Sequence, residues 1–118
     1  MRQPERQIQR AIRRYLNGMG YRTVAVPNGS QLAGGPVSRA KQMAALKLDG
    51  LTPGFPDLIV FASGGRVGFI EVKAEGGRMS EEQVTVRHWM QNEGHKHSVC
   101  RSIDDVTETL EKWGWIDG

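Results

Sequence analysis

The sequence predicts an α/β domain in which a small mixed β-sheet is flanked by helices. Two observations predict this class: amphipathic helical segments alternate with short apolar runs along the chain, and glycine-rich turns separate the runs. The chain has 118 residues and shows no internal repeat and no interdomain linker. We therefore expect residues 1–118 to form a single domain.

The first half of the chain is expected to place one strand between two helices. Ile8, Ile12 and Leu16 recur at helical spacing within residues 4–18, and arginines fall on the opposite side. Residues 21–26 (YRTVAV) are typical of a strand, and a loop rich in Gly, Pro, Asn and Ser follows. The next helix is expected to begin at Ser38, as its N-cap, and to end near residue 48.

The second half is expected to be built around a β-hairpin. Residues 57–61 and 67–73 read as two strands joined by a tight Gly64-Gly65 turn. The stretch SEEQ, residues 80–83, fits a capping box that opens a helix ending near residue 92. That helix should direct Val86, Trp89 and Met90 toward the core. A last strand over 97–101 and a helix over about 104–113 complete the order.

Charge is distributed unevenly along the chain. The net charge is +3, but residues 1–50 hold nine Lys and Arg against two acids, whereas residues 51–118 hold seven against eleven. A basic half favours a polyanionic partner, because neutralised phosphates release counterions. No apolar run approaches the ~20 residues that span a membrane, and a single cysteine excludes an internal disulfide framework. We expect a protein of a reducing compartment, most simply the cytoplasm.

Three charged residues stand where a buried hairpin should avoid charge. Strand alternation puts Glu71 and Lys73 on one side, roughly 7 Å apart along the strand. Antiparallel pairing brings Asp57, at the start of the partner strand, close to both. Two carboxylates and a lysine could hold a divalent cation that orients a phosphodiester and activates a water. The alternative is a salt-bridged surface patch at the strand ends.

Glu5 is a further acidic candidate, in the first helical segment. It precedes Ile8 by three residues and Ile12 by seven, so it lies on the apolar face and not among the arginines. A carboxylate on this face could bind a metal or another cation. The alternative is a favourable acid in the first turn of a helix.

These residues resemble the signature of a known nuclease superfamily. Pro56-Asp57 followed by Glu71-Val72-Lys73 is similar to the PD-(D/E)XK pattern. The flanking stretches PNG, PGFPDL, IEVK and SEEQ, with a tryptophan six residues on and a glutamate near the start of the first helix, narrow the resemblance to the VRR-NUC domain. It covers residues 5 to about 106 and is similar to the stand-alone type of phages and bacteria. The implied fold is a PD-(D/E)XK restriction-endonuclease-like core.

The resemblance implies an endodeoxyribonuclease that depends on Mg²⁺ or Mn²⁺. Asp57, Glu71 and the Val72 carbonyl would bind the metal, with Glu5 as a further ligand. Lys73 would position the attacking water or stabilise the phosphate. Gln83 matches the glutamine of the family's helix motif, although the capping box alone explains it. The implied catalytic set is therefore Glu5, Asp57, Glu71, Lys73 and Gln83.

DNA contacts are expected from the loop and helix that follow the first strand. Asn28 is a candidate at the substrate entrance, although a turn requires the same residue type. Arg39, Lys41 and Lys47 are candidate phosphate contacts, although solvated helix charges look identical.

The substrate expected from this resemblance is branched DNA, such as a Holliday junction. A short chain without a separate recognition domain has little room to read sequence, and a homodimer would supply two centres for paired cuts. A monomeric nickase or flap nuclease is the first alternative. The second is a non-catalytic DNA-binding module on the same fold, although Asp57, Glu71 and Lys73 are all present. The expected location is the cytoplasm of a bacterium or a phage-infected host.

Overall fold

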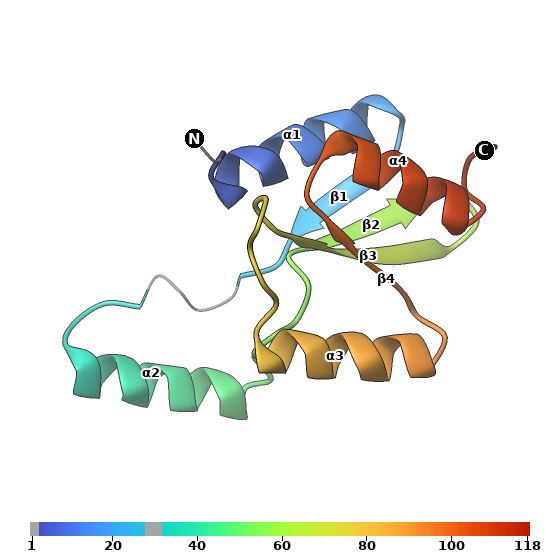
Figure 1. Ribbon diagram of the computed structural model, residues 1–118. Helices are drawn as coiled ribbons and strands as arrows, with labels where there is room; N and C mark the ends of the chain where they lie inside the picture. Colours follow the sequence, from blue (N-terminus) through green and yellow to red (C-terminus); the bar gives the residue numbers. More distant parts are fainter. Residues whose placement is uncertain (1–2, 28–31) are drawn as a thin grey trace.

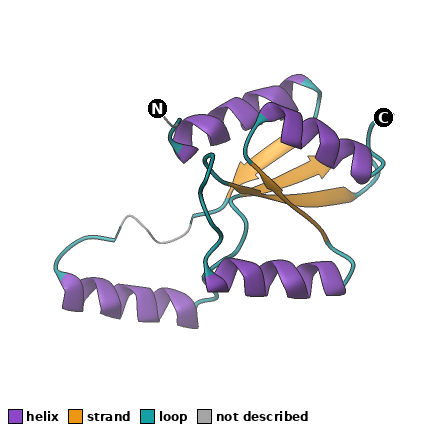
Figure 2. Cartoon of the chain, viewed as in Figure 1, coloured by secondary structure: helices purple, strands orange, loops and turns teal. Residues whose placement is uncertain are grey.

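A computed structural model describes residues 3–27 and 32–118. The elements alternate as the sequence predicts, and most boundaries differ from the expected ones by one or two residues. Their order, shown in Figures 1 and 2, is α1 (Glu5–Gly18), β1 (Arg22–Ala25), α2 (Pro36–Leu48), β2 (Leu58–Ala62), β3 (Arg66–Val72), α3 (Glu81–Asn92), β4 (Lys96–Cys100) and α4 (Ile103–Lys112).

The four strands form one mixed sheet in the order β1-β2-β3-β4. β1 pairs antiparallel with β2, and β2 pairs antiparallel with β3 in a register that sets Leu58 opposite Ile70. β4 runs parallel to β3, with Val72 opposite Cys100. α3 connects β3 to β4 as a crossover, which allows β4 to run parallel beside β3. The predicted α/β class with a small mixed sheet is confirmed.

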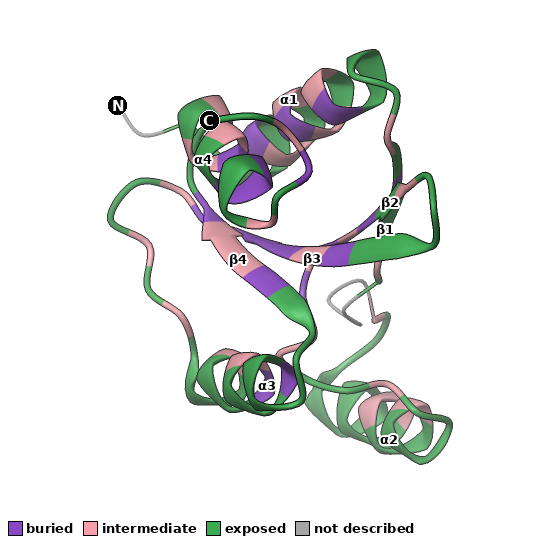
Figure 3. Ribbon diagram, turned by 90° about the vertical axis from the view of Figure 1, so that its right-hand side faces the viewer, coloured by how far each residue is buried: buried purple, intermediate pink, exposed green. Residues whose placement is uncertain are grey.

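Helices cover both faces of this sheet. α1 and α4 lie together on one face, and α3 lies on the other (Figure 3). The face under α1 and α4 is the main apolar core, because the inward stripe of α1 meets alternate residues of the central strands. Its buried members are Ile8, Ile12, Leu16, Leu58, Val60, Ile70, Val72, Cys100, Val106, Leu110 and Trp115.

The hairpin turn has the conformation that its glycines predict. Gly64 and Gly65 both have φ of +76°. Ala62 pairs with Arg66, so Ser63, Gly64 and Gly65 form a three-residue connection, and glycine adopts the two positive φ values without strain. The turn fixes the register of β2 and β3, and with it the pairing at the opposite end of the hairpin.

Two local predictions are wrong. The α2 helix begins at Pro36 after Gly35, not after Ser38, because proline at the first position supplies a helical φ and has no N–H to satisfy. The Ser38 hydroxyl instead accepts a hydrogen bond from Gln42. Trp89 is 43% exposed, because the narrow apolar face of α3 buries only Val86 and Met90.

α2 stands away from the rest of the molecule (Figure 1). Within the described parts of the chain it packs against no other helix or strand, and none of its residues is buried. Val37 is 70% exposed and Leu48 is 90% exposed. None of the helices formed by the described residues has the length and apolarity needed to span a membrane.

Candidate active site

The site is organised where β2 begins and β3 ends. The pairing of Leu58 with Ile70 sets Asp57 opposite Glu71, one step before β2 begins. The Asp57 carboxylate takes the place of a backbone acceptor there: its Oδ2 atom accepts a 2.7 Å hydrogen bond from the Val72 N–H. Because the N–H and C=O of one strand residue point to the same side, the Val72 carbonyl also faces Asp57.

Glu71 is the buried centre of the group, with only 1% of its surface exposed. Its Oε2 atom accepts a 3.0 Å hydrogen bond from Gln83 Nε2 and lies 3.7 Å from Lys73 Nζ. Its Oε1 atom is buried and has no hydrogen-bond partner among the described residues. A carboxylate oxygen in this state is costly unless a proton or a cation binds it.

The pKa of Glu71 is raised because burying its charged form is unfavourable. Burial, and after it the charge of the adjacent Asp57, together raise the pKa of Glu71 from its ordinary value of 4.5 to about 8. Lys73 lowers the pKa, but its effect is smaller than those of burial and of Asp57. Glu71 therefore retains its proton at neutral pH when nothing else supplies positive charge beside it.

Gln83 is held in place by the start of α3. Its side-chain carbonyl accepts a 2.8 Å hydrogen bond from the Ser80 N–H, and its own N–H donates to the Ser80 hydroxyl. The capping box is thus confirmed, and it fixes the orientation of the amide, because the NH₂ group must then face Glu71. The cap and the contact with the carboxylate are made by one side chain, so the two interpretations of Gln83 are compatible.

Gly54 brings the preceding loop directly against that helix start. Its φ is +87°, and a Cβ atom at this position would lie 2.4 Å from the Glu82 carbonyl and 2.6 Å from the Gln83 nitrogen. Both constraints require glycine, because a side chain would push the α3 N-terminus away from Glu71. The sequence gives no sign of this contact, since it depends on two segments that are almost thirty residues apart.

Arg101 stabilises the loop between β3 and α3 by hydrogen bonds to its backbone. Its Nη1 atom donates hydrogen bonds to the carbonyls of Ala74 (2.8 Å) and Gly77 (2.7 Å). Its backbone N–H is in turn held by the Asp105 carboxylate. This arginine therefore supports the segment that leads from Lys73 to the capping box. From the sequence, Arg101 was expected only as the last residue of the strand over 97–101, with no such role.

The remaining predicted residues lie farther from this group. Glu5 is exposed, and its charge makes the smallest of the contributions that shift the pKa of Glu71. Arg39, Lys41 and Lys47 are exposed on α2. Asn28 lies outside the described residues.

The donor set suits a small, hard cation. Among residues 3–27 and 32–118, no three His, Cys, Asp or Glu side chains gather as a metal site, so Glu5 does not complete a three-residue cluster with Asp57 and Glu71. Mg²⁺ and Mn²⁺ sites that act on phosphates do not need such a cluster, because one or two carboxylates and a carbonyl leave positions for waters and phosphate oxygens. The unpartnered Glu71 Oε1 atom fits this role.

The family model of the VRR-NUC domain matches residues 3–104, which include every element of this site. The chain belongs to the VRR-NUC domain family. A solved structure described as a VRR_NUC domain superposes with a TM-score of 0.65 over 92% of this chain and 96% of the other, at 18% sequence identity. That likeness confirms the PD-(D/E)XK-like fold. No curated protein sequence matches the chain. VRR-NUC domains are nuclease domains, so membership identifies a domain that acts on DNA.

Proposed function

We propose that this VRR-NUC chain is a Mg²⁺- or Mn²⁺-dependent endodeoxyribonuclease that hydrolyses phosphodiester bonds in branched DNA, such as Holliday junctions, as a homodimer. The observation that carries the catalytic part is the burial of Glu71 between Asp57, Lys73 and Gln83, with one carboxylate oxygen unpartnered. An ordinary structural ion pair would satisfy both carboxylate oxygens, because an orphaned buried acceptor is destabilising.

Each residue of the group has a separate task in this proposal. A divalent cation held by Asp57, Glu71 and the Val72 carbonyl would neutralise charge that develops on the phosphate and lower the pKa of an attacking water. Lys73 donates to that water or to a phosphate oxygen from its place beside Glu71. Gln83 is a positioning residue, since its amide binds Glu71 Oε2 and leaves Oε1 free to bind the cation.

Glu5 adds negative charge at the edge of this group. It is exposed at the N-terminus of α1 and acts electrostatically on Glu71. We assign it to the outer shell of the cation, where a carboxylate can accept hydrogen bonds from the waters that Mg²⁺ keeps.

α2 supports the DNA-binding and dimeric parts of the proposal. Arg39, Lys41 and Lys47 project from a helix that packs on no other described element, so their charges are available to a phosphate backbone. Val37 and Leu48 expose apolar surface on the same helix. A symmetric dimer that buries this surface would place two catalytic centres on one junction, each cutting one strand.

A substrate panel tests the proposal. Four-way junction, flap and linear duplex DNA are incubated with Mg²⁺, with Mn²⁺ or with a chelator. Cleavage of the junction that requires the cation and exceeds cleavage of the duplex supports the proposal, whereas equal cutting of the linear duplex overturns structure selectivity. Light scattering in the same buffer separates a homodimer from a monomeric nickase or flap nuclease.

The Lys73→Ala variant separates catalysis from binding. We expect it to lose cleavage while its DNA affinity stays within about twofold of the wild type, because one buried ammonium contributes little to a long phosphate track. Wild-type protein that binds DNA but shows no cleavage with either cation would identify a non-catalytic binding module on the same fold.

A further inference from the structure

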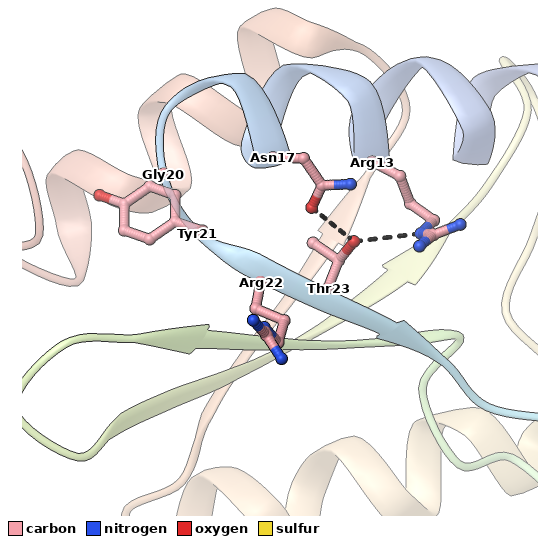
Figure 4. Close-up of a pocket in the computed structure, with 6 residues that line it drawn as sticks. All are labelled: Arg13, Asn17, Gly20, Tyr21, Arg22 and Thr23. Atoms are coloured by element: carbon pink, nitrogen blue, oxygen red, sulfur yellow. Dashed lines mark hydrogen bonds between the residues drawn. The ribbon is translucent and has the colours of Figure 1, made fainter.

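Two pockets lie near opposite ends of β1, and they differ in polarity. The pocket at the start of the strand is polar: the Thr23 hydroxyl accepts a 3.0 Å hydrogen bond from Arg13 Nε and donates one of 3.0 Å to the Asn17 side-chain carbonyl (Figure 4). The pocket at the end of the strand, called here the apolar pocket, has a volume of about 410 Å³, which is in the range of small-molecule sites. Its apolar walls are formed by Val26, Pro27, Leu46, Leu51 and Phe55.

The end of α2 gives the apolar pocket a fixed wall. The Leu51 N–H donates a 2.9 Å hydrogen bond to the Leu46 carbonyl, and the Gly50 N–H donates one of 3.1 Å to the Lys47 carbonyl. With Gly50 at a φ of +109°, these two bonds form a Schellman motif. Apolar residues at the positions of Leu46 and Leu51 commonly pack together in this motif, and both line the pocket.

Phe55 forms the aromatic wall of the apolar pocket and has a defined orientation. Its N–H donates a 3.1 Å hydrogen bond to the Thr52 carbonyl, which closes a turn. Its ring meets the Phe69 ring edge to face, with the centroids 5.7 Å apart. An aromatic ring held in this way is preorganised to pack against another flat ring, such as a nucleobase.

The apolar pocket adjoins the candidate metal ligand Asp57. The Val26 N–H donates a 2.8 Å hydrogen bond to the Asp57 carbonyl, which extends the pairing of β1 with β2 by one step. Directly paired residues of neighbouring strands direct their side chains to the same face, about 5 Å apart. Phe55 precedes Asp57 by two residues, which is at most about 7 Å of chain. Because a DNA strand rises about 3.4 Å per nucleotide, the pocket lies within about two nucleotides of a phosphate bound at Asp57.

Asp49 supplies a polar group at the rim of the apolar pocket. It is the C-cap of α2, is exposed and has no hydrogen-bond or ion-pair partner among the described residues. A carboxylate at the electronegative end of a helix repels a phosphate, but it accepts hydrogen bonds from the amino and ring N–H groups of a base. Lys47, exposed two residues earlier, offers the opposite charge to the backbone. Apolar walls with an acceptor at the rim therefore suit a base and not a phosphate.

From these observations we infer that the apolar pocket binds one unstacked nucleobase of the DNA substrate, within about two nucleotides of the cut phosphate. Phe55 packs on the base, and Asp49 accepts hydrogen bonds from it. Guanine is the preferred base, because it presents two adjacent N–H donors to the two carboxylate oxygens, whereas thymine has no amino group. The inference rests on the proposed nuclease function. Bases at a branch point are less costly to unstack than bases in a continuous duplex, so the pocket favours branched DNA.

The main test compares Asp49→Asn with Asp117→Asn, which removes the same charge from an exposed position outside the pocket. Fluorescence anisotropy without a divalent cation measures the Kd of four-way junctions that carry guanine or thymine, each paired, at one position near the branch point at a time. For the wild type and Asp117→Asn, guanine should bind about 5- to 100-fold more tightly than thymine at one position. Asp49→Asn should reduce this ratio below about threefold.

Two results of this measurement overturn the inference. One is a wild-type ratio below about twofold at every position, because a base held by the Asp49 carboxylate must be discriminated. The other is a ratio in Asp49→Asn that equals the ratio in Asp117→Asn, because the discrimination would then come from another part of the molecule.

Filling the apolar pocket tests its occupant directly. Leu46→Trp adds an indole at the wall, and no residue of α2 is buried, so the core is not disturbed. Met19→Trp, at a 40% exposed position after α1, is the control. A 2-aminopurine at the preferred position gains fluorescence when it leaves the stack. At saturating protein we expect this gain with the wild type and Met19→Trp but not with Leu46→Trp. Equal gains with all three proteins would show that the base lies elsewhere.

The readouts distinguish this inference from the proposed function. Junction cleavage by a protein that shows no base preference overturns the pocket assignment and leaves the nuclease function intact. A guanine preference that depends on Asp49, in a protein that cleaves no substrate, supports the pocket assignment and overturns the nuclease function.

Discussion

One end of the β2–β3 hairpin buries Glu71 and Lys73, whereas the other end packs aromatic rings against a glycine. At the turn end, the Trp113 ring lies where a Cβ of Gly68 would be. Its centroid is 4.9 Å from that of the Trp115 ring, with the two planes tilted by 58°, and the Arg66 guanidinium lies over the Trp115 ring. At the opposite end, a buried carboxylate keeps one oxygen unpartnered and has a raised pKa.

One end of this hairpin contributes to stability, and the other end carries the candidate site. The aromatic end gains dispersion and apolar burial, and its one buried polar atom without a hydrogen-bond partner among the described residues is the uncharged Trp115 indole nitrogen. The acidic end, which holds Asp57, Glu71 and Lys73, is destabilised by the desolvation of Glu71. The capping box, Gly54 and Arg101 hold this end in place. Destabilising charge supported by surrounding structure is typical of a functional site.

Removing the buried charge should have the largest effect on activity. Glu71→Gln keeps an acceptor for Gln83 but cannot ionise, so we expect cleavage to fall about 10³-fold or more. The free energy of unfolding at pH 8 should rise, because the buried charge is gone. Single-turnover cleavage and urea unfolding measure the two effects. Glu108→Gln, an exposed site in α4, is the matched control. A stable protein with unchanged cleavage would remove Glu71 from the mechanism.

Gly54→Ala should affect the acidic end through its backbone. A Cβ atom at this position collides with the backbone of Glu82 and Gln83, so the helix start must move away from Glu71. A displacement of about 1 Å near a reacting group can cost about 10²-fold, and we expect cleavage per folded molecule to fall about 10- to 100-fold. Gly18→Ala, which meets no atom within 4 Å, is the control. Gly54→Ala activity equal to that of the control would show that this packing does not position Gln83.

Gly68→Ala should affect the aromatic end and spare catalysis. The added methyl group would lie 2.3 Å from the Trp113 ring, so the ring must shift, at a cost of about 1–3 kcal/mol. Thermal or urea unfolding measures this loss. Cleavage per folded molecule should remain within about twofold of the wild type, because Gly68 lies on the face of the sheet opposite Glu71. A loss of cleavage comparable to that of Gly54→Ala would show that the two ends are coupled.

The pH dependence of stability should report on the acidic end, with the smallest expected effect. In the metal-free protein Glu71 keeps its proton up to a pKa of about 8, whereas its unfolded pKa is near 4.5, so this stabilisation is lost as pH rises through 8. His97 acts oppositely below pH 6.5, because burial lowers its pKa to about 4 and its stabilisation is lost as pH falls.

The window from pH 6.5 to 8 therefore isolates Glu71. We expect the free energy of unfolding of the wild type to fall across this window and that of Glu71→Gln to stay level. Added Mg²⁺ or Mn²⁺ should stabilise the wild type more at pH 8 than at pH 6.5, since binding requires the ionised carboxylate. An equal slope in both proteins would assign the pH dependence to another group.

The sequence alone determined the pairing of the two hairpin strands and the acidic end of the hairpin. Local signals sufficed there: the Gly64-Gly65 turn fixes the register, alternation places Glu71 and Lys73 on one face, and antiparallel pairing adds Asp57. The capping box was also readable, because it lies within four consecutive residues. Two predictions from the sequence were wrong. Ser38 was expected to cap α2, but the preference of proline for the first helical position started the helix at Pro36. Trp89 was expected in the core, but the buried face of α3 is too narrow to include it.

Only the tertiary structure decided how the acidic end is supported and which charges are free. The approach of Gly54 to Gln83, the hold of Arg101 on the loop before α3, and the orientation of Arg13 by Thr23 each join segments that are distant in sequence or differ in element. Such contacts depend on how helices and loops pack on the sheet, which residue type and periodicity do not specify. Residue types indicated the chemistry of this site, and packing fixed its geometry.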